Sequence, residues 1–140
     1  MSKVILRPFQ LLLDAGLIYS SYPKGVYHGS YEPITQDKSE WFKAFYATVK
    51  RQLETLENRH NITIACMEDD PNAILGYIIV ENDVLQFLYV KELFRNQGIA
   101  TLLAKQYKIK DVANLTKVGH AILSKHKPSK EGSNNEPESI

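Results

Sequence analysis

The stretch that decides the fold runs from Leu88 to Leu103 and reads LYVKELFRNQGIATLL. It begins as an apolar strand, passes through a short polar linker, and continues as a helical run from Gly98. The first backbone N–H groups of a helix have no partner within the helix, and together with the helix dipole they attract anions. A glycine there leaves the backbone bare, so Gly98 predicts either the close approach of a diphosphate or simply a tight strand-to-helix turn.

The residues around Gly98 suit an anion. Ala100 is small, Asn96 and Gln97 carry amide donors, and Arg95 carries a positive charge. A Walker-type loop is excluded because no Gly-Lys-Ser/Thr follows the glycine, and the sequence also lacks the G-x-G-x-x-G fingerprint of dinucleotide-binding folds.

The chain before this stretch supplies strands and turns. Apolar and β-branched runs predict strands at Lys3–Phe9, Ile62–Met67, Ile74–Glu81 and Val84–Val90, with hairpin turns between the last three. A weaker strand is predicted after the Gly98 helix, at Thr116–Leu123.

Three helices are predicted beside these strands. The first is short and covers residues 11–22, and proline and glycine then predict a long loop over 23–36. The second, over 37–60, has an apolar stripe at helical spacing and can be capped by Asp37 or Ser39. The third runs from Gly98 to about Asp111.

The six residues Arg95-Asn96-Gln97-Gly98-Ile99-Ala100 match the pattern Q/R-x-x-G-x-G/A, and an apolar strand end precedes them. This arrangement resembles motif A of the GCN5-related N-acetyltransferase (GNAT) superfamily. The strand Ile74–Val80 and the order of the elements are similar to that family over roughly residues 3–123. The resemblance implies an α/β (α+β) fold with a mixed, mostly antiparallel sheet flanked by helices.

The resemblance also implies an N-acetyltransferase that uses acetyl-CoA and acts on an unidentified amine. The pyrophosphate would meet the Gly98 loop, the pantetheine would pair with the preceding strand, and a backbone N–H near Val90 would polarise the thioester carbonyl. The residues implied to bind the cofactor are Leu88, Tyr89, Val90, Arg95, Asn96, Gln97, Gly98, Ile99, Ala100 and Thr101.

A general base must accept the proton of the incoming ammonium group. Glu81 and Asp83 are the candidates, although acids at a hairpin turn are also commonly just solvated. His28 and Tyr31 are candidate acceptor contacts in the predicted loop. No two histidines have metal-ligand spacing, so no metal site is predicted.

The composition predicts one compact domain. The 140 residues include 44% hydrophobic residues and carry a formal net charge of +1. Neither a basic face for nucleic acid nor an apolar run of about 20 residues for a membrane span is present. The single cysteine, Cys66, is expected to be a buried hydrophobe in a cytoplasmic protein. Residues 1–124 are predicted to form the domain, and the polar tail 125–140 to be disordered.

Compared with the GNAT pattern, the chain is expected to lack the usual C-terminal helix and last strands, which often supply a tyrosine as general acid. No tyrosine follows Tyr107. Short GNAT-like chains of this kind resemble proteins encoded by tailed bacteriophages. An alternative is therefore a non-catalytic structural component of a virion or other assembly, with homo-oligomeric or virion neighbours, located in the host cytoplasm or the virion.

Overall fold

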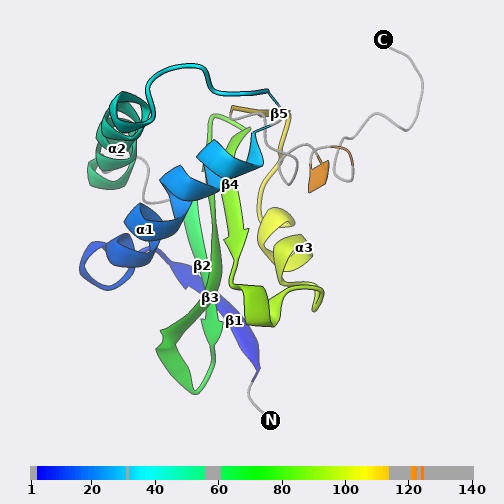
Figure 1. Cartoon of the computed structure of the whole chain (residues 1–140). Coiled ribbons are helices and arrows are strands. Elements are labelled where there is room, and N and C mark those ends of the chain that lie inside the picture. Colours follow the sequence, from blue (N-terminus) through cyan, green and yellow to red (C-terminus); the bar gives the residue numbers. More distant parts are fainter. Residues whose placement is uncertain (1–2, 31, 56–60, 114–120, 123, 125–140) are drawn as a thin grey trace, which may run out of the picture.

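The computed structural model describes residues 3–30, 32–55, 61–113, 121–122 and 124. Within these residues five strands form one sheet in the order β1-β2-β3-β4-β5 (Figure 1), and all neighbouring pairs are antiparallel except β4 and β5. The sheet is flanked by helices, so the predicted mixed, mostly antiparallel α/β fold is confirmed. The elements are β1 (Val4–Pro8), α1 (Leu11–Gly29), α2 (Lys38–Glu54), β2 (Ile62–Met67), β3 (Asp70–Glu81), β4 (Val84–Val90), the 3-10 helix η2 (Glu92–Phe94), α3 (Ile99–Ala104) and β5 (Asp111–Val112).

Helices cover both faces of the sheet. α1 and α2 lie on one face and α3 on the other (Figure 1). Two apolar clusters fill these layers, because successive strand residues alternate between the faces. Tyr22 and Val49 belong to the cluster beneath α1 and α2, whereas Leu75 and Leu103 belong to the cluster beneath α3. The sheet is therefore a central layer with a core on each side.

β4 contains a bulge that changes which face its side chains reach. Ile79 pairs with Phe87, but the next residue, Val80, pairs with Leu85, so Gln86 is an extra residue in β4. Leu85 and Leu88 consequently lie in the α3 cluster together, although an unbroken strand would place them on opposite faces. The bulge brings Phe87 to the face covered by α1 and α2.

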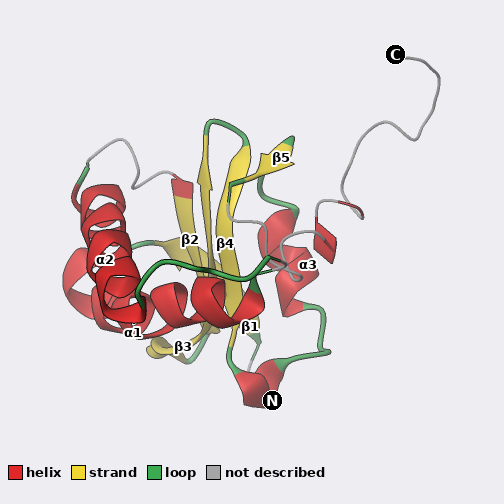
Figure 2. Ribbon diagram, turned by 45° about the horizontal axis from the view of Figure 1, so that its top comes forward, coloured by secondary structure: helices red, strands yellow, loops and turns green. Residues whose placement is uncertain are grey.

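α1 is much longer than predicted. It continues through Pro23 and Gly25 to Gly29, where the sequence predicted a loop. In the second half of the helix Tyr22 and Val26 are buried in the core, so packing against the sheet outweighs the poor helix propensity of proline and glycine. Figure 2 shows α1 lying across the sheet.

The region after Gly98 also differs from the prediction. α3 has six residues, and the chain turns after it to form β5 at Asp111–Val112, where helix was expected. The predicted strand Thr116–Leu123 falls mostly outside the described residues, and Ala121 and Ile122, which are described, are helical. The pairing of β5 with β4 is a contact between distant parts of the chain, so the local helical pattern after Gly98 does not reveal it.

The other predicted boundaries agree closely. β2 and β4 have the predicted ends, and the Asp37 carboxylate accepts a 3.2 Å hydrogen bond from the Glu40 amide, so Asp37 is the cap of α2. β3 starts at Asp70, four residues early, because the turn is only Glu68–Asp69 and the ladder beyond Cys66 is irregular. Cys66 is buried as predicted. The predicted tail at 125–140 and the end of the 37–60 helix beyond residue 55 lie outside the described residues.

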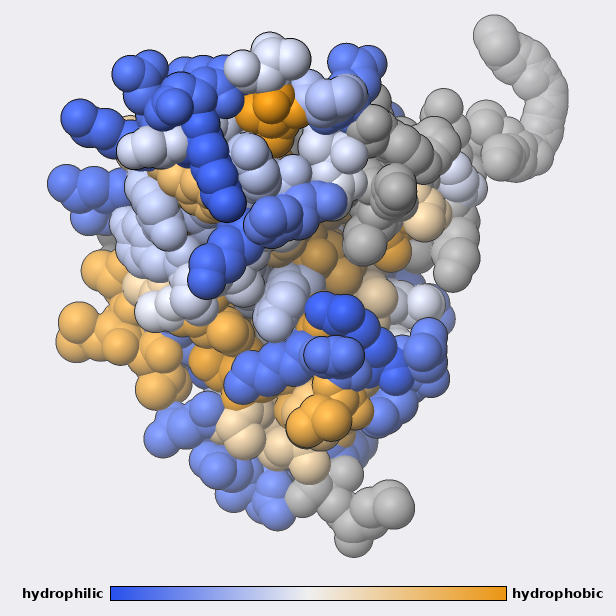
Figure 3. Space-filling view, viewed as in Figure 1, coloured by the Kyte–Doolittle hydropathy of each residue, from blue (hydrophilic) through white to orange (hydrophobic). Residues whose placement is uncertain are grey.

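Two surface features complete the description. Apolar side chains gather over the start of α1 (Figure 3), where Leu12 is fully exposed and Leu11 and Leu13 are partly exposed. Across the part of the chain that is described, no helix is long and apolar enough to span a membrane.

Candidate functional site

A cavity of about 530 Å³ lies where α1, β4 and the start of α3 meet. Figure 1 shows the end of α1 crossing β4, while α3 starts beyond the C-terminal end of that strand. The cavity therefore borders the second half of β4. Its lining residues are Gly25, Gly29, Phe87, Leu88, Tyr89, Val90, Phe94, Arg95, Asn96, Gly98, Ile99, Ala100 and Thr101.

The Gly98 loop forms one end of this cavity. Gly98 has φ +84° and Asn96 has φ +64°, so two residues of the loop are left-handed. A Cβ added at Gly98 would meet nothing within 4 Å. The glycine is thus required by the turn and also leaves open space in front of the backbone, so the two explanations offered by the sequence are compatible.

Arg95 is held against the end of β4. Its Nε donates a 2.7 Å hydrogen bond to the carbonyl oxygen of Val90, and its guanidinium lies 5.9 Å from the centre of the Tyr89 ring. Among the described residues that line the cavity, Arg95 is the charged one. An anion at this end of the cavity would therefore meet a cation whose position is fixed by the strand.

The backbone of β4 has a defined orientation along the cavity. Lys91 N–H donates to Leu75 C=O at 2.8 Å, which makes that pair a hydrogen-bonded pair of the antiparallel ladder. Hydrogen-bonded pairs alternate with non-hydrogen-bonded pairs along an antiparallel ladder. Tyr89 and Tyr77, two residues further along, therefore form the next hydrogen-bonded pair, and the peptide groups of Tyr89 face β3. The N–H and C=O groups of Leu88 and Val90 consequently point away from β3, toward the opposite edge of β4.

Among the described residues, that opposite edge is paired over only part of its length. β5 runs parallel to β4 and pairs with Val84 and Leu85. In the described ranges no strand continues this pairing along Leu88–Val90. This part of the edge borders the cavity, and an extended ligand could join it as an added strand.

The far wall of the cavity comes from α1, which the sequence analysis did not assign to the site. Gly25 and Gly29 lie four residues apart, on one side of the helix, and both line the cavity together with Phe87. Glycine destabilises a helix, so two glycines at helical spacing are a signal that the helix needs a side without side chains. The sequence analysis missed this signal because it interpreted the segment as a loop.

The structure brings together most of the residues that the sequence predicted for cofactor binding. Gln97 is the exception, because its side-chain Nε2 donates to Leu93 C=O at 3.4 Å and it does not line the cavity in the described structure. The others do line it: Leu88, Tyr89, Val90, Arg95, Asn96, Gly98, Ile99, Ala100 and Thr101.

The two candidate bases lie at the other end of β4 and are not among the described lining residues. Glu81 ends β3, accepts a 3.2 Å hydrogen bond from Gln52 Nε2 and lies 3.6 Å from Arg51 Nη1. Gln52 Nε2 also lies 3.2 Å from Gln86 Oε1, so a polar network joins Glu81 to the bulge of β4.

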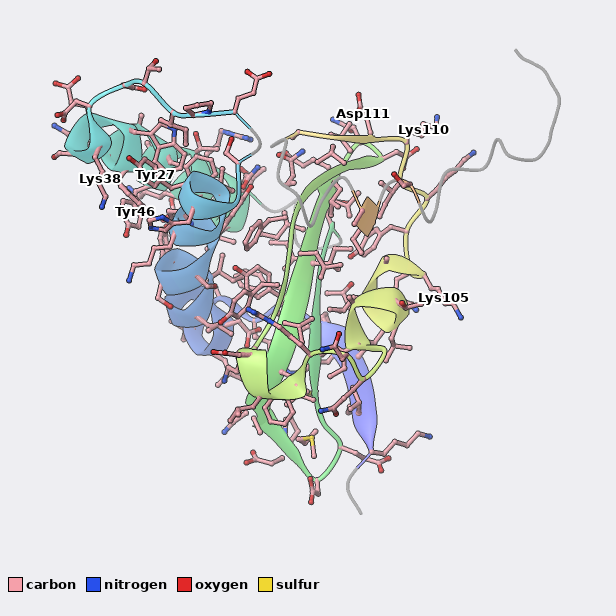
Figure 4. All side chains as sticks on the ribbon, turned by 45° about the vertical axis from the view of Figure 1, so that its right-hand side comes forward. Tyr27, Lys38, Tyr46, Lys105, Lys110 and Asp111 are labelled. Atoms are coloured by element: carbon pink, nitrogen blue, oxygen red, sulfur yellow. The ribbon has the colours of Figure 1, made fainter. Side chains whose placement is uncertain are left out.

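Asp83 occupies the turn itself. Its φ is +64° and that of Asn82 is +53°, as in a two-residue hairpin turn, and its carboxylate lies 3.7 Å from Lys110 Nζ. Figure 4 shows Lys110 and Asp111, the first residue of β5, away from α3. The turn conformation and the ion pair with Lys110 account for an aspartate at this position without a role at the cavity.

The described residues among the remaining candidates contact other side chains of the fold. His28 is in the last turn of α1, where its ring meets that of Tyr27 edge-on at 5.1 Å, and Tyr31 lies outside the described residues. Tyr107 follows α3, and its hydroxyl is 2.6 Å from Thr63 Oγ1. In the described ranges no three His, Cys, Asp or Glu residues are grouped to hold a metal ion.

A family model described as an acetyltransferase (GNAT) domain matches residues 29–129. The chain belongs to the GNAT acetyltransferase family. The match includes β4, the Gly98 loop and α3, so the motif recognised in the sequence lies within the family domain. Acetyltransferases of this family take the acetyl group from acetyl-CoA. No curated protein matches the chain.

Solved structures show the same fold. A candidate acetyl transferase from Pyrococcus furiosus is 13% identical with a TM-score of 0.59, and the comparison covers 99% of this chain and 100% of that one. A GCN5-related N-acetyltransferase from Ralstonia eutropha JMP134 is 16% identical with a TM-score of 0.57 and 99% coverage of both chains. Apo YjaB from Escherichia coli is 14% identical with a TM-score of 0.50; the comparison covers 74% of this chain and 63% of YjaB. At these identities the likeness concerns the fold alone.

Proposed function

We propose that this GNAT protein is an N-acetyltransferase that binds acetyl-CoA in the cavity along β4 and transfers the acetyl group to an amine. The observation that carries the proposal is the cavity itself, which is lined by the bare backbone at Gly98 and by Leu88–Val90 of β4, an edge that no strand of the described residues pairs with. A diphosphate and an extended amide-containing chain are the two chemistries that these features suit.

Each part of the cavity has a proposed task. The backbone of residues 97–101 and the guanidinium of Arg95 would hold the pyrophosphate. Asn96, which lines the cavity next to Arg95, would add an amide donor. Ile99 and Ala100 would pack beside it, and Gln97 would contribute its backbone N–H rather than its side chain.

The edge of β4 would hold the pantetheine arm. Val90 N–H and the peptide groups of Leu88 are the groups we assign to this pairing, because those of Tyr89 are directed to β3. The Leu88 N–H is one residue from Phe87, at the end of the cavity away from Gly98. We assign to it the hydrogen bond that polarises the thioester carbonyl, the role that the sequence analysis gave to an N–H near Val90.

Acetyl-CoA supplies an acetyl thioester, whose C–S bond breaks as a C–N bond to the acceptor forms. The chain's part is to orient the amine and accept its proton. Glu81 is the proposed base, acting through water, because it is linked by Gln52 to Gln86 beside Phe87. Asp83 is the weaker candidate, since the turn and Lys110 already account for it.

The alternative proposal, a non-catalytic component of a phage virion or another assembly, predicts a cavity filled by the chain's own side chains. The cavity of about 530 Å³ favours the enzyme. A location in the cytoplasm, where acetyl-CoA is made available to enzymes, accompanies the enzymatic proposal.

Thermal unfolding with and without acetyl-CoA tests the proposal. A ligand present at about 100 times its dissociation constant should stabilise the native state by about 2.7 kcal/mol. A clear rise in the melting temperature, followed by release of CoA thiol in the presence of an amine panel, is expected. The absence of any rise at millimolar acetyl-CoA would refute the proposal and leave the assembly role as the better one.

A further inference from the structure

Phe87 is a fixed aromatic wall of the cavity. Its side chain is 8% exposed and lines the cavity. One face of its ring stacks on Tyr22, with ring centres 4.8 Å apart and planes 19° apart. The Tyr77 ring lies 6.1 Å away at a tilt of 47°. Both tyrosines are fully buried, so they leave the Phe87 ring little room to retreat on those sides.

Gly25 fixes the ring from a third side. A Cβ built on Gly25 would overlap Cζ of Phe87 and would lie 2.8 Å from Cε1. The tip of the ring therefore occupies the space that any side chain at position 25 would need. With Tyr22, Tyr77 and Gly25 around it, the ring can move appreciably only into the cavity.

This wall stands at one end of the cavity. A strand rises about 3.3 Å per residue, so Phe87 is about 10 Å along β4 from Val90, whose carbonyl holds Arg95. The Gly98 loop, with its bare backbone, is at the Arg95 end, and Gly25, Gly29 and Phe87 are at the other.

We propose that Gly25 and Phe87 close the acyl end of the cavity and restrict the donor to short acyl-CoA thioesters such as acetyl-CoA. The proposal rests on the function proposed above, since it requires the pyrophosphate to bind at the Gly98 end. A longer acyl chain would have to displace a ring that Tyr22, Tyr77 and Gly25 hold in place. An extra methylene that does not fit a packed pocket typically reduces binding about tenfold or more.

Calorimetric titration of the wild-type chain and of Phe87→Leu with CoA, acetyl-CoA and butyryl-CoA tests the proposal without an acceptor. The wild type should bind butyryl-CoA at least about tenfold more weakly than acetyl-CoA. Phe87→Leu shortens the wall and should reduce that ratio severalfold. Phe45→Leu is the matched control, because Phe45 packs edge-on against the same Tyr22 at 5.0 Å but does not line the cavity; it should keep the wild-type ratio.

Gly25→Ala provides a second variant in the opposite direction. Its Cβ should push the Phe87 ring into the cavity and weaken the binding of acetyl-CoA relative to that of CoA. Adding Phe87→Leu to the same chain should restore the wild-type ratio of the two affinities. Equal wild-type affinity for acetyl-CoA and butyryl-CoA, or a ratio that neither Phe87→Leu nor Gly25→Ala changes, would overturn this inference while leaving the proposed function in place. Failure of the wild type to bind CoA at all would overturn both.

Discussion

Arg95 donates a hydrogen bond from Nε to the carbonyl oxygen of Val90 over 2.7 Å, which ties the loop before α3 to the last residue of β4. The bond joins the two parts of the proposed cofactor site. Because it uses Nε, the flat guanidinium is held in one orientation at the end of the cavity that contains Gly98.

Replacement of Arg95 should therefore weaken CoA binding more than the loss of one positive charge elsewhere in the chain does. Arg95→Gln is expected to reduce CoA affinity about tenfold or more, since charge-assisted hydrogen bonds to phosphate contribute more than neutral ones. Arg51→Gln removes the same charge at a residue that does not line the cavity and is the control. Titration calorimetry with CoA measures both; equal losses in the two variants would show that Arg95 acts only through net charge.

Gly76 lies opposite Val90 in the β3–β4 ladder, and its lack of a side chain allows the strands to approach. A Cβ there would overlap the carbonyl oxygen of Tyr89 and lie 3.1 Å from Val90 Cα. Gly76→Ala is expected to lower the free energy of unfolding by about 1–3 kcal/mol. The control is Gly16→Ala at an exposed position in the first half of α1, where a Cβ meets nothing within 4 Å, and a gain of about 0.5–1 kcal/mol is expected. Urea unfolding measures both, and a harmless Gly76→Ala would contradict the tight approach of β3 and β4.

Tyr77 should make the fold sensitive to alkali. Burial raises the pKa of its hydroxyl well above the ordinary value of 10.0, although the hydrogen bond with Ser21, 2.7 Å long, opposes the shift. Ser21 donates its own proton to Leu17 C=O, so Tyr77 is the donor to Ser21. Because the folded-state pKa is the higher one, this contribution to stability is complete below pH 10 and is lost as the pH rises above it.

Urea unfolding at several values between pH 8 and pH 11 measures this effect. The free energy of unfolding of the wild type is expected to fall above about pH 10, and Tyr77→Phe should reduce the steepness of that fall. Tyr46→Phe, which removes a hydroxyl from a partly exposed ring, should leave the slope as in the wild type. Identical slopes in all three chains would show that Tyr77 is not a source of the pH dependence.

The proposed base can be distinguished from the acid of the turn by its effect on the rate. Once an acceptor is found, Glu81→Gln should lower kcat, because the proton of the incoming ammonium group loses its proposed acceptor. Asp83→Asn should keep the wild-type kcat, because Asp83 serves the turn. Assays of CoA release at saturating acceptor provide the measurement, and an undiminished kcat in Glu81→Gln would assign the base to another group.

Much of the fold was predictable because it is recorded in local patterns. Apolar and β-branched runs located β2 and β4, and the polar break at residues 82–83 located the turn between β3 and β4. The loop around Gly98 was predictable for a similar reason, since a left-handed backbone conformation favours glycine. These features depend on residues close together in the sequence.

The wall formed by α1 was not predictable in the same way. Pro23, Gly25 and Gly29 indicate a loop when read locally, and only contact with Phe87, 62 residues after Gly25, explains why a helix with glycines fits there. The strand β5, at Asp111–Val112 where helix was predicted, forms by pairing with β4, which is also a tertiary contact. Local propensity yields to packing at both places.

The most direct test of the account is CoA affinity in Gly98→Asn. Asparagine tolerates the left-handed conformation that φ +84° requires, so the fold should lose no more than about 1 kcal/mol, while the new side chain stands where the pyrophosphate would approach. Gly16→Asn, which adds the same side chain on the exposed part of α1, is the control. The account predicts measurable CoA binding by the wild type and by Gly16→Asn and a loss of at least about tenfold in a folded Gly98→Asn. Undiminished CoA affinity in Gly98→Asn would contradict the placement of the cofactor.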